Sequence, residues 1–322
     1  MVTGAWARWR RALGGPPEEP GAAPEPFRAQ GGAVHLRDFP DPFVLATAGG
    51  YTAYATNGGG ENVPAMVSGD LAHWEPVGDV LPRLPAWAQA GFTWAPAVLP
   101  RAGHHVLYYT VREPRSGRQC ISAAAGPGPA GPFRDDRAEP LVFQRLLGGS
   151  IDPSPFVDDD GTAWLLWKSD DNALGRPSRL WARPLAPDGL AFTGEPAELL
   201  RHDQRWERPL IEAPAMVRHD GRCYLFYSAN WWESARYGVG YAVGPGPTGP
   251  FTKVTTAGPW FAGGDGAAGP GGQELFTDGQ GRLRMAFHGW SPDRVGYAQG
   301  GARRLHVACV DFDAQGRPVV SG

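Results

Sequence analysis

The stretch IEAPAMVRHDGRCYLFYSAN, residues 211–230, places an acid and a proline at the start of an apolar run. A His-Asp-Gly turn and a second apolar run follow. The same layout occurs in IDPSPFVDDDGTAWLLWKSD, residues 151–170, and three further copies begin at Pro40, Trp94 and Gly272. The copies align, at spacings of 53, 58, 60 and 61 residues, on Asp41, Trp94, Asp152, Glu212 and Gln273. Such a regular period predicts a repeat architecture.

Each copy predicts two antiparallel strands joined by a tight turn, because Asp-Gly and Gly-rich turns of this length connect hairpins. Further strand candidates follow four copies, at residues 120–126, 179–185, 238–244 and 305–313. Several strands per unit of about 60 residues are typical of a propeller blade. The 46 Gly and 33 Pro suit a turn-dense chain. We therefore predict an all-β, five-bladed β-propeller at residues 31–322, after a Pro-rich, flexible N-terminal arm at residues 1–30.

Three of the aligned positions carry acids. In a propeller the first strand of each blade lies nearest the axis, so we expect Asp41, Asp152 and Glu212 to meet around one central cavity. The simpler interpretation is that Asp-Pro only marks a turn. An acid at equivalent positions in three of five repeats favours a functional site, because inward-facing charges are seldom kept without a role.

In this order and spacing the motifs resemble glycoside hydrolase family 43. They are FPDPFV at 39–44, SGDLAHWEPVG at 68–78, FTWAPAV at 92–98, SIDPSPFVDDDGTAWL at 150–165 and IEAPAMVRHDGRCYLFYS at 211–228. The family consists of five-bladed propellers that cut arabinose- and xylose-containing polysaccharides. The resemblance implies that Asp41 is the general base, that Asp152 tunes the acid and orients the substrate, and that Glu212 is the general acid.

These roles match the chemistry of an inverting glycosidase. One carboxylate activates water and one carboxyl protonates the leaving oxygen, at a separation of roughly 6.5–9.5 Å. Glu212 must hold a proton at the working pH, and we expect the Asp152 anion to raise its pKa by like-charge repulsion.

Aromatic and polar neighbours complete the predicted site. We expect Phe39 and Trp94 to form an apolar floor under a sugar ring, because aromatic faces suit the C–H faces of sugars. Three further tryptophans follow strand ends and are candidates for the rim: Trp231, Trp232 and Trp290. Gln273 is also predicted to bind substrate, and it stands close to a position where many relatives carry a histidine.

His288 has two interpretations. Similar arabinan-cleaving enzymes have a histidine near here that helps to hold a calcium or other metal ion on the axis. Calcium prefers oxygen ligands, so waters would supply most of its coordination. The alternative is a buried histidine satisfied by backbone groups. The chemistry itself requires no cofactor.

Composition argues against other classes. The formal net charge is −3, and no basic stripe interleaved with aromatics predicts nucleic-acid binding. No apolar run is long enough to span a membrane, and the N-terminus lacks the apolar core of a signal peptide. We expect either a cytoplasmic location or secretion without a recognisable signal. Cys120, Cys223 and Cys309 form neither a disulfide framework nor a metal-binding pattern.

Substrate class follows from the resemblance alone. Related β-xylosidases usually carry an added C-terminal β-sandwich, whereas this sequence stops soon after the fifth repeat. We therefore expect an α-L-arabinofuranosidase or arabinanase, with β-xylosidase as the alternative. Retaining fructan hydrolases share the Asp, Asp and Glu set, but they show N-D-P-N-G and E-C motifs that differ from DFPDPF and IEAPA here. A non-catalytic carbohydrate-binding propeller is the third alternative.

Overall fold

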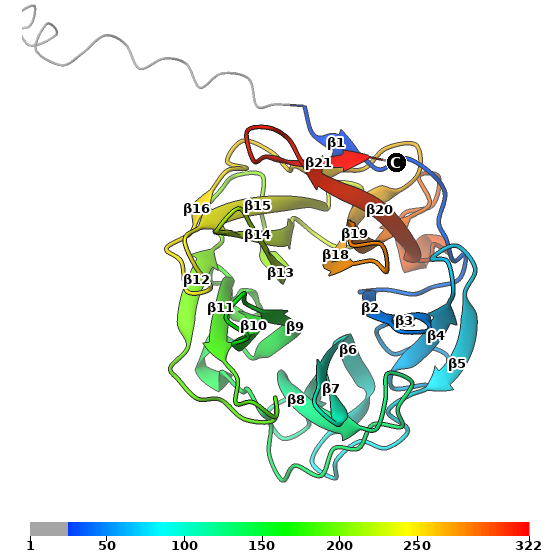
Figure 1. The fold of residues 1–322 in the computed structure, drawn as a ribbon, viewed down its shortest axis with the longest axis vertical. Coiled ribbons are helices and arrows are strands. Elements are labelled where there is room, and N and C mark those ends of the chain that lie inside the picture. The colour runs from blue at the N-terminus through cyan, green and yellow to red at the C-terminus, as the bar shows by residue number, and fades with distance from the viewer. Residues whose placement is uncertain (1–24, 322) are drawn as a thin grey trace, which may run out of the picture.

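The computed structural model describes residues 25–321, whose strands form five sheets around a central axis (Figure 1). Blade 1 contains β2 (Phe43–Thr47), β3 (Gly50–Tyr54), β4 (Pro64–Ser68) and β5 (Glu75–Asp79). Blade 2 contains β6 (Gln89–Arg101), β7 (His104–Glu113) and β8 (Arg118–Gly126). Blade 3 contains β9 (Ser150–Val157), β10 (Ala163–Ser169), β11 (Arg179–Pro184) and β12 (Ala197–Arg201).

Blade 4 contains β13 (Ile211–His219), β14 (Arg222–Ala229), β15 (Gly238–Gly244), β16 (Thr252–Lys253) and β17 (Phe261–Ala262). Blade 5 contains β18 (Ala268–Thr277), β19 (Leu283–Trp290), β20 (Arg304–Phe312) and β21 (Pro318–Ser321). Short 3₁₀ turns occur at Arg145–Leu147, Asp171–Leu174 and Tyr297–Gln299. The predicted all-β, five-bladed β-propeller is confirmed, and the strands predicted in each repeat are present.

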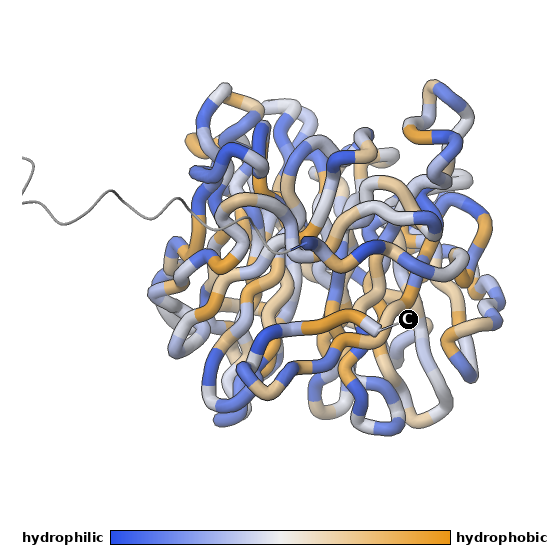
Figure 2. Tube along the Cα trace, turned by 90° about the horizontal axis from the view of Figure 1, so that it is seen from above, coloured by the Kyte–Doolittle hydropathy of each residue, from blue (hydrophilic) through white to orange (hydrophobic). Residues whose placement is uncertain are grey.

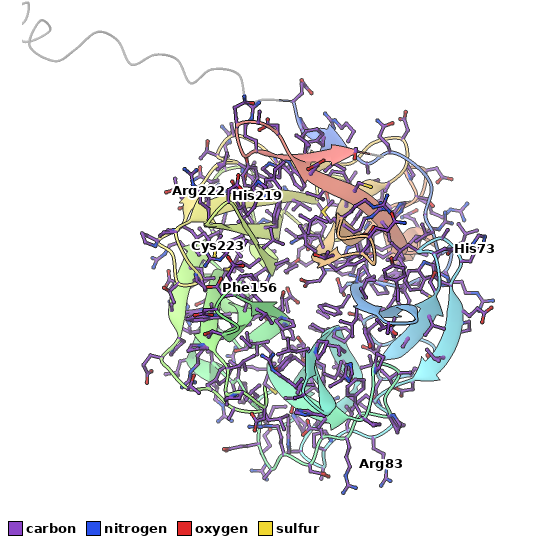
Figure 3. All side chains as sticks on the ribbon, in the orientation of Figure 1. His73, Arg83, Phe156, His219, Arg222 and Cys223 are labelled. Carbon is purple, nitrogen blue, oxygen red and sulfur yellow. The ribbon has the colours of Figure 1, made fainter. Side chains whose placement is uncertain are left out.

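Strand alternation explains how the blades pack. Successive side chains of a strand point to opposite faces, and both faces of each sheet are covered here. Leu165 and Trp167 of β10 face blade 2, whereas Leu166 between them faces blade 4. One buried apolar cluster fills each of the five blade interfaces within the described chain, so the core is a ring of clusters rather than a single centre. Hydrophilic residues are frequent in the loops at both ends (Figure 2), and side chains fill the space between the sheets (Figure 3).

The chain before blade 1 fastens the ring. Strand β1 (Phe27–Arg28) pairs in parallel with β17 at the edge of blade 4. The following segment then crosses blade 5, where Val34 N–H donates to Leu305 O at 2.9 Å and Phe39 N–H to Arg303 O at 2.8 Å. Ordered propeller structure therefore begins before residue 31, the boundary predicted from the sequence. The Pro-rich composition of the predicted arm concealed β1, and residues 1–24 of that arm lie outside the described residues.

A search of residues 25–321 for helices found none with the length and apolar character needed to cross a membrane.

Candidate active site

A cavity of about 350 Å³ is lined by residues within or next to the inner strands of all five blades. A volume of this size falls at the lower end of the range for small-molecule sites. Asp41, Asp152 and Glu212 all line it, although they come from blades 1, 3 and 4. The structure therefore brings together the three acids that the repeat pattern predicted to converge.

One backbone feature recurs in every blade at this level. Asp41, Ala95, Asp152, Ala213 and Gly272 have φ values of 53°, 43°, 57°, 49° and 55°. This left-handed region is sparsely populated for residues other than glycine, and such strain concentrates at functional sites. These five residues, rather than the ones matched from the sequence, are the structural equivalents of one another.

The sequence alignment was therefore wrong by one residue in three repeats. Trp94 and Glu212 lie one residue before the left-handed position, and Gln273 lies one residue after it. The sequence does contain a marker of the correct alignment. A proline directly follows the left-handed residue in four blades: Pro42, Pro96, Pro153 and Pro214. Strand pairing is also irregular here, with a register shift between Glu212 and Ala215. A bulge of this kind re-aims side chains, which accounts for an inward-facing carboxylate at either of two neighbouring positions.

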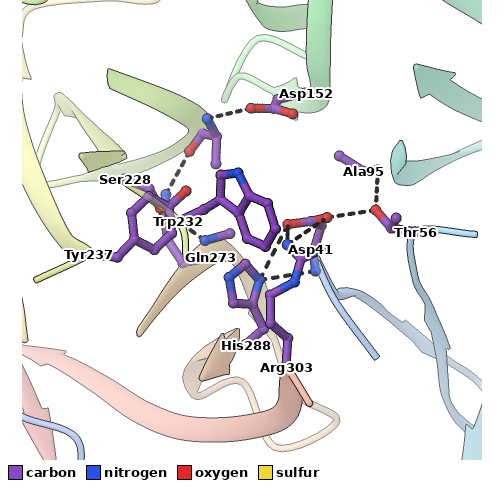
Figure 4. Close-up of polar contacts among 12 residues, drawn as sticks. Asp41, Thr56, Ala95, Asp152, Ser228, Trp232, Tyr237, Gln273, His288 and Arg303 are labelled. Carbon is purple, nitrogen blue, oxygen red and sulfur yellow. Dashed lines mark hydrogen bonds and ion pairs between the residues drawn. The ribbon is translucent and has the colours of Figure 1, made fainter. Parts of the chain in front are cut away.

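Asp41 sits in a polar cage (Figure 4). Arg303 Nη1 lies 3.2 Å from its Oδ1, and Thr56 donates to its Oδ2 at 2.6 Å. Thr56 Oγ1 also accepts the Ala95 N–H at 2.9 Å, which ties blade 1 to blade 2. Burial alone would raise the pKa of Asp41, but the Arg303 charge and the hydrogen bonds lower it below its ordinary value. Asp41 is therefore an ionised carboxylate at neutral pH.

Asp152 and Glu212 form an interacting pair on the other side of the cavity. Asp152 Oδ2 accepts the Ala213 N–H at 2.9 Å, next to Glu212 itself. Burial, and then the Glu212 charge, raise the pKa of Asp152. On the same side of the cavity, the Lys168 ammonium lies 3.3 Å from Oε2 of Glu212. The raised pKa that the sequence argument predicts for Glu212 stays a prediction.

Gln273 holds the backbone beside the acid. Its Nε2 donates to Ala213 O at 2.7 Å, and its Oε1 accepts the Ser228 hydroxyl at 2.6 Å. Ser228 Oγ in turn accepts the Gly272 N–H at 2.9 Å. Gln273 lines the cavity as predicted for a substrate-binding residue, but both ends of its buried amide bind protein groups.

His288 is fully buried beside Asp41 (Figure 4). Its Nδ1 lies 3.1 Å from the backbone nitrogen of Asp41 and 3.3 Å from Asp41 Oδ1, and its Nε2 has no hydrogen-bond partner among the described residues. Within residues 25–321, no group of three or more His, Cys, Asp or Glu side chains is placed to hold a metal ion. A metal ion held by His288 and mainly by waters stays a prediction, and His288 contacts both the backbone and the carboxylate of Asp41.

Of the two aromatic residues predicted to lie under a sugar ring, only one lines the cavity. Trp94 lines the cavity, whereas Phe39 is 3% exposed and packs against Val44 in the core between blades 5 and 1. Phe39 is thus corrected from a sugar-binding to a core residue. Trp232 takes the cavity wall instead, with the Arg303 guanidinium 4.7 Å from the centre of its ring. Of the other rim candidates, Trp290 is buried beneath Trp232 and Trp231 is exposed.

Four polar cavity or near-cavity residues carry no motif in the sequence. Arg303 precedes β20, Tyr237 precedes β15, and Lys168 and Glu274 lie within strands. Tyr237 OH donates to Glu212 Oε1 at 2.8 Å. None of the four stands at an aligned repeat position, so the repeat pattern did not connect them with the site.

Comparisons with known proteins agree with this geometry. The model of the family "Glycosyl hydrolases family 43" matches residues 33–318. The β-D-galactofuranosidase xynD of Aspergillus niger is 28% identical over 262 residues, which cover 77% of this chain and 69% of that protein. Xylosidase/arabinosidase 43A of Humicola insolens is 30% identical over 197 residues, which cover 49% of this chain and 56% of that protein. The chain thus spans little more than half the length of the second relative.

Among solved structures, a thermostable family-43 glycoside hydrolase superposes with a TM-score of 0.79. Its sequence is 27% identical, and the match covers 92% of this chain and 96% of that one. The family match spans nearly the whole propeller, including Asp41, Asp152 and Glu212. The chain therefore belongs to glycosyl hydrolases family 43.

Proposed function

We propose that the protein is an inverting glycosidase that releases arabinofuranosyl groups from xylan- or arabinan-type saccharides. The observation that supports this most directly is the convergence of Asp41, Asp152 and Glu212 on one cavity. Asp41 accepts a proton from water as the water oxygen attacks the anomeric carbon. Glu212 gives its proton to the glycosidic oxygen as the C–O bond breaks, and that oxygen keeps the bonding electrons. Asp152 tunes Glu212 and orients the sugar.

The electrostatics are consistent with this division of roles. Arg303 keeps Asp41 ionised, as a proton acceptor must be. Asp152 and Glu212 interact strongly, so the proton on this side of the cavity belongs to the pair and can serve the leaving group. Trp94 and Trp232 both provide apolar surface in the same cavity, which suits a sugar ring.

A second candidate substrate is a β-D-galactofuranoside, because the A. niger relative matches 77% of this chain. A β-D-galactofuranosyl ring has the same ring configuration as an α-L-arabinofuranosyl ring and carries one extra hydroxymethyl carbon. A β-xyloside is the third candidate, since the H. insolens relative is named for both xylose and arabinose.

The test compares para-nitrophenyl α-L-arabinofuranoside, β-D-galactofuranoside and β-D-xylopyranoside as substrates. We expect the arabinoside to be hydrolysed fastest, with proton NMR showing the inverted anomer first. Asp41→Asn should lower kcat by about 10²–10⁴-fold, the usual contribution of a general base. Asp136→Asn, at an exposed carboxylate after β8, is the matched control and should retain activity.

Full activity in Asp41→Asn would contradict the assignment of the base, and a retained anomer would contradict inversion. If the wild type cleaves none of the three substrates or debranched arabinan but still binds arabinoxylan, the propeller is a carbohydrate-binding module rather than an enzyme.

A further inference from the structure

Lysine is rare in this chain. Among 30 basic residues, the sequence contains only two lysines, Lys168 and Lys253, and arginine supplies all the others. Lys168 lies on β10, the second strand of blade 3, with its side chain 1% exposed. A lysine ammonium is a compact point charge. Both lysines of this arginine-rich chain are buried, and each is ion-paired to two carboxylates.

The Lys168 ammonium touches two carboxylates. Its Nζ lies 3.0 Å from Asp170 Oδ1 and 3.3 Å from Glu212 Oε2. The other oxygen of Glu212, Oε1, accepts the Tyr237 hydroxyl at 2.8 Å. Among the described residues, Tyr237 lines the cavity and Lys168 does not. Oε2 therefore points back into the blade, and Oε1 lies on the side of the cavity.

The two donors differ in what they permit. An ammonium can only donate, so Oε2 stays an acceptor for as long as Lys168 is charged. A phenol hydroxyl can donate or accept, so Tyr237 can turn its hydrogen away when Oε1 carries a proton. The arrangement fixes one oxygen of Glu212 and leaves the other free to be protonated.

We propose that Lys168 is a positioning residue that holds Oε2 of Glu212 and so reserves Oε1, the oxygen on the cavity side, for the proton delivered to the leaving group. This inference rests on the proposed function, in which Glu212 is the general acid. Asp170 is the second carboxylate that pairs with Lys168. When Glu212 is neutral, Asp170 remains as counter-ion, so the buried ammonium is never left unpaired, which would be costly.

Charge around Glu212 comes from several elements. The nearest groups are Lys168 on β10, Asp152 on β9 and Tyr237 before β15; across the cavity lie Asp41, Glu274, His288 and Arg303. Burial alone would lower the pKa of Lys168, but the Glu212 and Asp170 carboxylates raise it above its ordinary value. In general an ammonium beside a carboxyl group opposes its protonation, whereas neighbouring carboxylates favour it.

The kinetic test uses Lys168→Met, which keeps most of the length of the side chain and removes its charge. Acid assistance matters for poor leaving groups and hardly for good ones. We therefore expect kcat to fall about 10²-fold on an unactivated arabinosyl oligosaccharide, the usual contribution of a general acid. On the 2,4-dinitrophenyl arabinoside the loss should be below about 3-fold, and the alkaline limb of the pH profile should move up by roughly one unit.

Lys253→Met is the matched control. Lys253 is the other buried lysine and is ion-paired to Glu207 and Asp203, both at 2.7 Å, outside the cavity. Its replacement should lower the Tm without moving the pH limb or changing the leaving-group dependence. Lys168→Arg keeps the cation and should keep the pH limb in place, which covers the case that Lys168→Met does not fold. If Lys168→Met loses the same factor in kcat on both substrates, the proposal is overturned. It is also overturned if the alkaline limb of the pH profile moves in Lys168→Arg.

A second readout does not need activity. Carboxyl ¹³C NMR of protein labelled with [¹³C]glutamate, with Glu212→Gln to assign the resonance, follows the protonation of Glu212 directly. We expect its midpoint to rise by roughly one unit in Lys168→Met. An unchanged midpoint would refute the role of Lys168. A wild type inactive on every glycoside, with the midpoint moving as expected, would refute the proposed function instead.

Discussion

At the scale of single residues, the site depends on one backbone conformation repeated in five blades. In four blades an L-residue adopts it, and in blade 5 glycine does. A Cβ built on Gly272 would lie 2.6 Å from His288 Nδ1 and 2.9 Å from Asp41 Oδ1. The glycine is therefore required by the close approach of the base and its histidine as well as by φ.

Gly272→Ala should separate these two effects. We expect it to displace Asp41 and to lower kcat/KM by at least about 10²-fold, because small misplacements of catalytic groups cost this much. Gly281→Ala is the control, since Gly281 has a φ of 77° but nothing within 4 Å of the added Cβ. Both variants should lose about 1 kcal/mol of stability from left-handed strain. An active Gly272→Ala would show that Asp41 and His288 can move apart without consequence.

Residue types alone predicted the acids better than their surroundings. Asp41, Asp152 and Glu212 stand at repeat positions, so their convergence could be derived from the period. Phe39 and Trp232 both adjoin strand ends, and only the structure shows that the first is core and the second is cavity wall. Arg303 reaches Asp41 across 262 positions of sequence, a pairing that no local pattern contains.

At the scale of elements, the hairpins were predictable and the closure of the ring was not. Inner strands and their partners follow from apolar runs joined by Asp-Gly and Gly-rich turns, which are local signals. Strand β1 has no such signal, because it is two residues long and follows a Pro-rich stretch. It is a strand because it docks on β17, where the Phe27 ring meets Trp260 edge to face at 6.0 Å. Tertiary contact decides strand formation in such cases.

Phe27→Ala tests whether β1 fastens the ring. We expect the free energy of unfolding in urea to fall by about 2 kcal/mol, from the loss of a partly buried aromatic side chain. Because β1 lies at the outer edge of blade 4, kcat and KM well below the Tm should not change. Val254→Ala is the control on the same blade, at a side chain 50% exposed, and should be nearly neutral. Equal stability of the two variants would mean that β1 adds nothing to closure.

At the scale of the whole molecule, one buried carboxyl group in the cavity makes the stability of the propeller depend on pH. Glu274 of blade 5 accepts a hydrogen bond from Ser154 of blade 3 at 3.2 Å. Burial raises its pKa from 4.5 to about 8. The folded state therefore keeps a proton that the unfolded state releases. This contribution to stability is fully present below the ordinary pKa and is lost as the pH rises through the folded value.

We accordingly expect Glu274 to contribute a fall in Tm between about pH 4.5 and 8, which the lowered pKa values of the buried His288 and His306 oppose. Glu274→Gln keeps the shape and a hydrogen-bonding amide but cannot ionise, so its Tm should fall less across this range. Part of the slope should remain, because the raised pKa of Asp152 acts in the same direction. Glu75→Gln, at an exposed position on β5, should reproduce the wild-type slope. A Glu274→Gln variant with the wild-type slope would contradict the assignment.

The scarcity and burial of lysine have a practical consequence. Both lysine side chains are almost fully buried, Lys168 at 1% and Lys253 at 6% exposure. A protease that cuts only after lysine would find one site inside the inner hairpin of blade 3 and the other beside β15 of blade 4. Cleavage at either site requires the blade to open, so its rate reports how often that blade unfolds. The same protein digested at its many arginines would report surface loops instead.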